Sequence, residues 1–276
     1  MNLDHFLATP GKFKSLEKYP TRDDYGVDDK QKAAGYMEQY MEKMQDLQDR
    51  LYADNRHSLL LIFQAMDAAG KDSTIRHVMS GINPQGCQVY SFKQPSPEEL
   101  DHDFLWRTTR ALPERGRIGI FNRSYYEEVL VVKVHPQILL KQGLPGLTDV
   151  AEVDADFWKK RYRSINDFEK HMVENGTEVV KFFLHVSKEE QAERFLKRIE
   201  EPDKNWKFSI SDVEERKYWD AYQAAYTDMI RETSTEEAPW YIIPADRKWY
   251  MSLVVAEIIL ERLSALDLNY PPLTPQ

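Results

Sequence analysis

A short apolar run, followed by a loop of small residues and a Gly-Lys pair, constrains this chain more than any other feature. Residues 58–74 read Ser-Leu-Leu-Leu-Ile-Phe-Gln-Ala-Met-Asp-Ala-Ala-Gly-Lys-Asp-Ser-Thr. The apolar run is typical of a buried strand, and a helical pattern begins near the glycine. Backbone N–H groups of such a loop and of the first helical turn converge on one point, where the helix dipole adds positive potential. The stretch therefore predicts a phosphate-binding loop.

The loop matches the common phosphate-binding pattern G-x-x-x-x-G-K-[ST] only in part. Ala65 stands at the first glycine position, and Asp72 follows the lysine, with Ser73 one place late. An ordinary strand-to-helix turn with a surface Lys71 is the alternative that the pattern leaves open. Asp67 inside the loop favours phosphate binding with a metal ion, because a carboxylate among phosphates requires a cation between them. We therefore expect Mg²⁺ at Asp67, with Mn²⁺ as the alternative ion.

Length and composition fit one α/β domain, with or without an appendage. The chain has 276 residues, of which 42% are hydrophobic and 30% charged. The formal net charge of −9 argues against nucleic acid as a partner, so any polyanion needs a local basic groove. We find no signal-peptide pattern and no apolar run approaching about 18 residues. We therefore expect a cytoplasmic protein with no membrane partner.

Hydrophobic periodicity predicts five strands that alternate with helices. The expected strands are 59–63, 87–92, 117–122, 178–186 and 240–243. The expected helices include 30–53, 70–80, 97–111, 154–174, 187–199, 211–231 and 248–266. Several strands are apolar on both faces, which indicates a parallel sheet covered on both sides. The predicted fold class is α/β, a three-layer fold with a five-stranded parallel sheet, helices on both faces and a helical lid.

Two segments are predicted to extend from this sheet. Residues 1–28 are polar, contain several breakers and are predicted to form an N-terminal arm that wraps the domain or a partner subunit. Residues 29–276 are predicted as a single domain, in which the helical hairpin before the last strand forms a lid at about 194–215. Sequences at 187–190 and 211–214 match capping boxes that open the hairpin's helices. The arm and a methionine-rich first helix are compatible with a homo-oligomer, either a dimer or a tetramer.

The third expected strand ends in a polar cluster, residues 122–128, which reads Asn-Arg-Ser-Tyr-Tyr-Glu-Glu. Ligands of parallel α/β sheets bind beyond the carboxyl ends of the strands, so this cluster is expected to face the loop after the first strand. Phosphoryl transfer needs a group that holds Mg²⁺ and a positive charge for the transition state. Asn122, Arg123 and Glu127 fit these roles. An ordinary capped turn at a strand end is the alternative.

The predicted lid carries a second cluster, made of cations. Arg194, Lys197 and Arg198 are spaced i, i+3 and i+4 and share one helix face, and Lys204 and Lys207 follow. Such a set is suited to line a groove for a polyanion. The alternative is a solvated helix whose cations pair with neighbouring glutamates.

Five segments in this order resemble polyphosphate kinase family two, and the resemblance runs from about residue 10 to the C-terminus. They are residues 64–72, 121–128, 206–209, 219–220 and 238–246. The resemblance implies a P-loop kinase-like fold with a lid. It also implies Mg²⁺-dependent phosphoryl transfer between inorganic polyphosphate and nucleotides, which are then the expected partners.

The resemblance also implies roles for individual residues. Asp67 corresponds to the family's metal-associated acid, and Lys71 to the loop lysine that holds phosphates. The expected catalytic residues are Asp67, Lys71, Arg123 and Arg198, and the expected metal ligands are Asp67 and Glu127. The expected substrate-binding residues are Ala68, Ala69, Gly70, Lys71, Asp72, Ser73, Arg76, Asn122, Arg194, Lys204 and Lys207.

One departure from the family pattern narrows the expected activity. Many members carry aspartate at the position of Asn122 and asparagine at that of Glu127, and the exchange here resembles the third class, said to phosphorylate both AMP and ADP. We therefore expect direct in-line transfer from polyphosphate to AMP and ADP, giving ADP and ATP, and leave guanine nucleotides open as acceptors. Two alternatives remain: an ATP-dependent nucleotide kinase, and a phosphate-binding regulatory protein without turnover.

Overall fold

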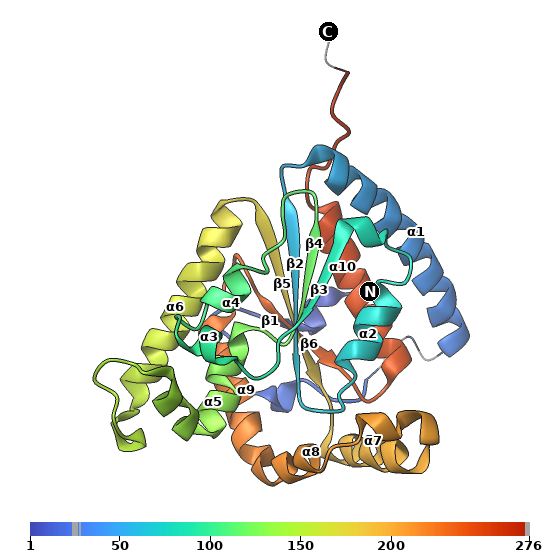
Figure 1. The fold of residues 1–276 in the computed structure, drawn as a ribbon. Helices are drawn as coiled ribbons and strands as arrows, with labels where there is room; N and C mark the ends of the chain where they lie inside the picture. Colours follow the sequence, from blue (N-terminus) through green and yellow to red (C-terminus); the bar gives the residue numbers. More distant parts are fainter. Residues whose placement is uncertain (24–26, 28, 274–276) are drawn as a thin grey trace.

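The computed structural model describes residues 1–23, 27 and 29–273, and it shows a twisted sheet between two layers of helices (Figure 1). The strands of these residues are β1 (Leu7–Ala8), β2 (Ser58–Ala65), β3 (Cys87–Ser91), β4 (Ile118–Asn122), β5 (Thr177–His185) and β6 (Trp240–Pro244). Their order in the sheet is β1-β6-β5-β2-β4-β3. All pairs among β2 to β6 are parallel, so the predicted three-layer fold and its five parallel strands are confirmed.

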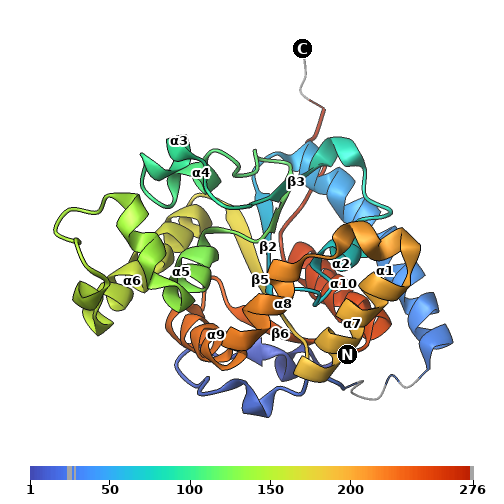
Figure 2. The same cartoon turned by 60° about the horizontal axis from the view of Figure 1, so that its bottom comes forward.

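Helices cover both faces of the sheet, as predicted. They are α1 (Lys30–Asp54), α2 (Lys71–Val78), α3 (Pro97–Leu100), α4 (Trp106–Thr109), α5 (Val131–Val134), α6 (Ala155–Glu174), α7 (Lys188–Glu200), α8 (Ile210–Glu215), α9 (Trp219–Thr233) and α10 (Lys248–Ser264). Figures 1 and 2 show α1, α2 and α10 on one face and α5, α6 and α9 on the other, with α7 and α8 across the carboxyl ends of the strands.

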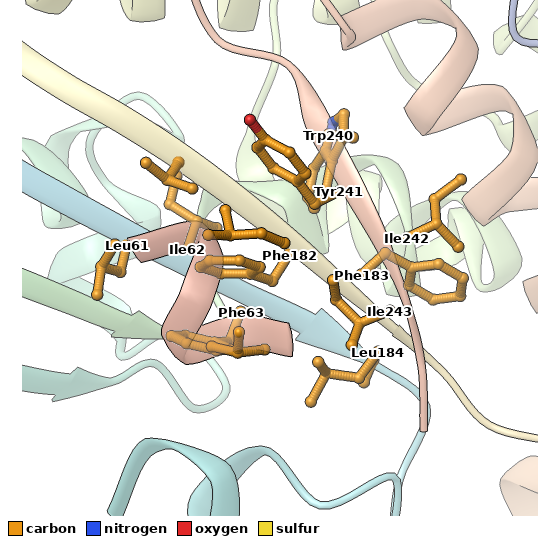
Figure 3. Packing of buried hydrophobic residues seen from close by; sticks show 14 of the residues in the cluster. Leu61, Ile62, Phe63, Phe182, Phe183, Leu184, Trp240, Tyr241, Ile242 and Ile243 are labelled. Carbon is orange, nitrogen blue, oxygen red and sulfur yellow. The ribbon is translucent and has the colours of Figure 1, made fainter. Parts of the chain in front are cut away.

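Strand β2 lies at the centre of the core. Every residue of β2 is buried, since β5 and β4 pair with it on its two edges and helices cover both faces of the sheet (Figure 1). Its Phe63 ring stacks on Phe182 of β5 with centroids 4.9 Å apart, among the aliphatic side chains shown in Figure 3. Each fully buried side chain of this size contributes about 1.5–3 kcal/mol. The loop that follows β2 therefore extends from a strand that is buried along its whole length.

The N-terminal segment packs along the edge of the sheet that lies opposite to β3. Strand β1 pairs antiparallel with β6, and Phe6 and Phe13 are buried in the common core. The sequence did not predict β1, because two residues are too few to show an alternating pattern. Of the predicted arm, residues 24–26 and 28 lie outside the described residues. The arm covers the β6 edge, which would otherwise present unpaired backbone groups.

One predicted helix is wrong in its extent. The stretch 97–111 forms two separate turns of helix, α3 and α4, instead of one continuous helix. Between them the Asp103 carboxylate accepts the N–H of Leu105 at 2.9 Å, and the Asp103 carbonyl accepts that of Trp106 at 3.0 Å. An aspartate that captures nearby backbone donors in this way competes with a helix.

The predicted capping boxes of the hairpin are only half confirmed. Ser187 caps α7 by accepting the N–H of Glu190, but its own N–H donates to Asp246 at 2.8 Å instead of to a glutamate. The second box is wrong, since α8 begins at Ile210 and Ser211 lies within its first turn. The single helix expected from 211 to 231 is also divided, because a 3-10 turn, η8 (Arg216–Tyr218), separates α8 from α9.

Candidate active site

The loop between β2 and α2 turns through two residues with left-handed backbone. Ala68 has φ +60° and Gly70 has φ +110°. A Cβ on Gly70 would lie 3.1 Å from Met251 Cε, so both the backbone angle and the close packing favour glycine here. The Lys71 ammonium lies back over the loop and donates to the Ala65 carbonyl at 2.8 Å. The Ser73 hydroxyl donates to the Gly70 carbonyl at 2.8 Å, which closes the first turn of α2.

Helix α7 supports this loop from behind. Arg194 donates to the carbonyls of Ala68 at 3.1 Å and Ala69 at 2.5 Å, and its other terminal nitrogen donates to the carbonyls of Ala245 and Asp246 after β6. Its Nε donates to Glu190 at 2.8 Å, so all five N–H groups of this buried guanidinium are occupied. In this arrangement Arg194 supports the loop, and the predicted contact with substrate would require one of these bonds to break.

A second support was not predicted from the sequence. The Gln191 amide donates to the Asp67 carbonyl at 2.9 Å, and its oxygen accepts from Arg216 at 3.2 Å. Gln191 is 1% exposed. Its position one turn before Arg194 on the same helix face is the only sequence signal, and nothing in the spacing indicates which backbone groups that face meets.

The end of β4 faces the loop, as predicted. Arg123 has φ +63° and donates its backbone N–H to the Phe63 carbonyl at 3.1 Å. Its guanidinium donates to Asp67 Oδ1 at 2.9 Å. Beside it, Asn122 donates to Asp72 Oδ1 at 2.5 Å. The parallel pairing of β2 with β4 therefore places the two predicted clusters against each other.

Glu127 completes the cluster from the 3-10 helix η4 (Tyr125–Val129), which Ser124 caps. The buried amide of Gln64, oriented to satisfy both of its ends, donates to Glu127 Oε1 at 2.9 Å and accepts from the Ser124 N–H at 3.1 Å. Gln64 was not predicted, although it is a polar residue at the end of an apolar strand. Burial raises the pKa of Glu127, and the nearby charges of Arg123 and Lys71 oppose that rise.

The four charged groups of the cluster alternate in sign. Burial lowers the pKa of the Lys71 ammonium and the Arg123 charge adds to this effect, while Asp67 and Glu127 oppose it. Each carboxylate thus stabilises a cation that is suited to hold phosphate oxygens. Burial raises the pKa of the Tyr226 phenol of α9, and the charges of Glu127 and Asp67 add to that rise.

The predicted cations of the hairpin each contact different partners. Arg198 donates to Asp212 Oδ2 at 3.0 Å and to the Lys207 carbonyl at 3.1 Å, so it braces the hairpin internally. Lys204 pairs with Glu201, and the Lys207 ammonium lies 5.0 Å from the centre of the Trp206 ring. Asp212 was not predicted as a site residue; burial raises its pKa, and the charge of Asp67 adds to the rise.

The two remaining predictions are a substrate contact at Arg76 and a magnesium site. Arg76 is exposed in the last turn of α2. Among the described residues, no three or more His, Cys, Asp or Glu side chains gather as a metal site. Asp67 and Glu127 nevertheless fit a magnesium ion, because Mg²⁺ in kinases is held by one or two carboxylates together with substrate phosphates.

A phosphate-binding loop on a parallel sheet, faced by an arginine at the next strand end and covered by a helical hairpin, defines the nucleotide-kinase class of phosphotransferases. A family model described as Polyphosphate kinase 2 (PPK2) matches residues 27–270. The chain belongs to the polyphosphate kinase 2 family.

Relatives agree in fold and along most of the sequence. The ADP-polyphosphate phosphotransferase of Rhodopseudomonas palustris is 56% identical over 270 residues, which cover 98% of this chain and 92% of the relative. The AMP/ADP-polyphosphate phosphotransferase of Meiothermus ruber is 47% identical over 229 residues, or 83% of this chain and 80% of the relative. The crystal structure of polyphosphate kinase 2 from Arthrobacter aurescens TC1 matches with a TM-score of 0.88 and 38% identity, covering 96% of this chain and 90% of that one. The P-loop kinase-like fold is thereby confirmed.

In the part of the chain that the structure describes, no helix combines the length and the apolar character needed to cross a bilayer.

Proposed function

We propose that this protein transfers a phosphoryl group from inorganic polyphosphate to AMP and to ADP, giving ADP and ATP. The relatives named above carry these activities in their names, and they align with 98% and 83% of the chain. The observation that carries the proposal is the bond between Arg123 and Asp67, which joins the two clusters into one charged site. Both substrates are polyanions, so a site of alternating cations and carboxylates at a loop of backbone N–H groups is suited to bring them together.

The protein's own part in this reaction is positioning and charge stabilisation. Lys71 and the N–H groups of the loop hold phosphate oxygens, and Arg123 stabilises the charge that develops on the transferred group. Asp67 orients Arg123 through its 2.9 Å bond. Arg198 of the hairpin is the second cation proposed for this developing charge, and Lys204 and Lys207 add positive charge along the donor chain. Transfer is direct and in line, because this chemistry needs no covalent enzyme intermediate.

A magnesium ion is part of the proposal, with Mn²⁺ as the alternative. Asp67 and Glu127 are the residues that would hold it, and it would neutralise phosphate charge between donor and acceptor. The Asn122 and Glu127 pair distinguishes this chain from members with aspartate and asparagine there. We propose that this exchange permits both acceptor lengths, and that Glu127→Asn shifts the ratio of AMP to ADP turnover. An unchanged ratio in the Glu127→Asn protein would contradict this part.

The experiment that tests the activity contains no ATP. The protein is incubated with AMP, long-chain polyphosphate and Mg²⁺, and nucleotides are followed by chromatography. ADP should appear first and ATP later. Formation of ATP from added ADP without any turnover of AMP would limit the acceptor to ADP. No product from polyphosphate, together with nucleotide phosphorylation by ATP, would instead indicate an ATP-dependent kinase.

A matched pair of variants tests the role of the loop acid. Asp67→Asn keeps the size of the side chain but removes the charge that orients Arg123 and attracts the metal. We expect kcat to fall by about 10²–10³-fold, as for other charge-stabilising groups, while polyphosphate still binds. Asp46→Asn, at a side chain of α1 that is 53% exposed, is the control and should retain wild-type kcat. Full activity of the Asp67→Asn protein would remove this carboxylate from the mechanism.

Two further parts of the proposal concern acceptors and assembly. We propose guanine nucleotides as additional acceptors, and a homodimer or homotetramer as the assembly. The same assay with GMP and GDP tests the first, and light scattering of the purified protein tests the second. A monomer over the assay's concentration range would contradict the assembly.

A further inference from the structure

An ion pair without any solvent contact lies behind the active site. Lys181, in the middle of β5, donates to Glu169 Oε2 of α6 at 2.6 Å, and the two side chains are 0% and 1% exposed. Burial lowers the pKa of the Lys181 ammonium, and the Glu169 charge opposes that shift. A buried pair of this kind gives up the hydration of both ions, and replacing it with apolar residues is often neutral or stabilising. Stability alone therefore does not account for the pair.

The pair is the centre of a network in which every strong donor is satisfied. Lys181 also donates to the Tyr126 hydroxyl at 2.9 Å and to the Thr233 carbonyl at 2.7 Å, which uses all three of its protons. Glu169 Oε1 accepts the hydroxyls of Tyr125 at 2.8 Å and Tyr126 at 2.7 Å. Two phenols thus converge on one carboxylate oxygen, and their directions of donation are fixed.

The two tyrosines are the first residues of η4, and they lie between Arg123 and Glu127 in the chain. A 3-10 helix has weak internal bonding, so its position depends on side-chain contacts. Both rings are fully buried, and the Tyr126 ring meets Trp240 edge-on at 4.7 Å. The positions of Tyr125 and Tyr126 therefore determine the positions of the residues that flank them in the chain.

We propose that the Lys181–Glu169 pair is a positioning device for the phosphoryl-transfer site, which acts through the two tyrosine hydroxyls to hold Arg123 and Glu127. The inference rests on the proposed function, because its kinetic effect is read in that reaction. Neither residue touches the substrate in this scheme. A displacement of about 1 Å at reacting groups lowers rates by about 100-fold, so a network that fixes η4 has a large kinetic effect.

The test compares two ways of weakening the network. Tyr126→Phe keeps the ring and removes the hydroxyl, and the double variant Lys181→Met with Glu169→Gln removes both charges at nearly constant length. In each we expect kcat with polyphosphate and ADP to fall about 10- to 100-fold while KM for polyphosphate changes less than about threefold. Amide hydrogen exchange at 123–129 should rise in both variants.

The control pair joins the start of the same strand to α10, through Glu178 of β5 and Arg262 of α10. Glu178, near the start of β5, accepts from Arg262 Nε at 2.6 Å and is largely buried. The double variant Arg262→Met with Glu178→Gln should leave kcat and exchange at 123–129 unchanged, even if the free energy of unfolding falls. If the Lys181 double variant fails to fold, the Tyr126→Phe and Tyr125→Phe proteins decide the question.

Two outcomes would overturn the inference. One is a folded network variant with kcat within about twofold of wild type. The other is an equal loss of kcat in the control pair, which would indicate a general effect of stability. Wild-type protein that does not use polyphosphate would contradict the proposed function instead. The exchange measurement would then still show whether the network holds η4.

Discussion

Single residues of this site are fixed by groups far away in the sequence. The loop residues Ala68 and Ala69 are bonded to Arg194, 126 and 125 positions later in the chain. The guanidinium replaces hydration that these carbonyls would otherwise need. A side chain of another element, α7, therefore holds the backbone of the phosphate loop in its conformation.

We expect Arg194→Met to be strongly destabilising. The change removes five hydrogen bonds and leaves buried carbonyls without donors, which should lower the free energy of unfolding by about 2–5 kcal/mol. KM for polyphosphate should rise as the loop loses its shape. Lys197→Met is the control, because Lys197 lies on the same helix with a side chain 53% exposed. Equal urea midpoints for the two variants would contradict the supporting role.

The single cysteine gives a prediction about pH. Burial raises the pKa of the Cys87 thiol from 9.0 to about 11. At pH 8 its thiolate fraction, and hence its alkylation rate by iodoacetamide, should be about 100-fold lower than for an unperturbed thiol. The folded thiol holds its proton longer than the unfolded one, so its contribution to stability declines as pH rises from about 9 toward 11. Alkylation of native protein as fast as in urea would contradict this.

The sequence predicts the charged groups that the structure brings together, but not the groups that support them. Asp67, Lys71 and Arg123 were predicted because loop spacing and a strand end identify them. Gln191 was not, since its role depends on which carbonyl the folded α7 meets.

The helical hairpin is the element in which prediction and structure differ most. The sequence predicts Ser211 as the cap of one helix to about residue 231, but Ser211 lies inside α8 and a 3-10 turn separates α8 from α9. Such boundaries depend on which serine meets a free backbone donor, and here Ser209 and Ser211 bond each other at 2.6 Å. Its apolar side chains are unusually open, with Trp206 78% and Ile210 71% exposed. These features are expected of an element that contacts a ligand.

Trp206 therefore offers an optical test of the lid. If polyphosphate binds along Lys204 and Lys207, the Trp206 ring between them should become less exposed to water. Its fluorescence emission should then shift to shorter wavelength. Trp206→Phe should abolish the shift, whereas Trp249→Phe, in the partly buried start of α10, should retain it. The same shift in both variants would show that the hairpin does not report binding.

Across the whole molecule, the parallel sheet was predictable because several of its strands are apolar on both faces. The β1 edge was not, since its two residues carry no periodic signal. Yet the arm is well integrated: Phe6 is 1% exposed, and its carbonyl accepts the Ile242 N–H at 2.7 Å. Sequence patterns thus predict the layers of strands and helices more readily than the short segments that pair at the edge of the sheet.

Removing one ring from the arm tests how far it stabilises the whole fold. Phe6→Ala should lower the free energy of unfolding by about 3–5 kcal/mol, through lost burial and the cavity that remains. The active site is distant, so kcat of the folded fraction should stay near wild type. Leu273→Ala, 99% exposed, should change stability by no more than about 0.5 kcal/mol. A Phe6→Ala protein as stable as that control would show that the arm is dispensable.

The central position of β2 has a consequence for synthesis of the protein. The loop emerges early from the ribosome, yet β2 needs β5 on one side, and about 114 residues separate Lys71 from His185. At about 5–20 residues per second, the nascent chain carries an unformed phosphate loop for about 6–23 seconds. During this interval the apolar β2 segment has no partner on its β5 side. Translation pauses between β4 and β5 should therefore reduce the yield of active enzyme more than pauses after β6.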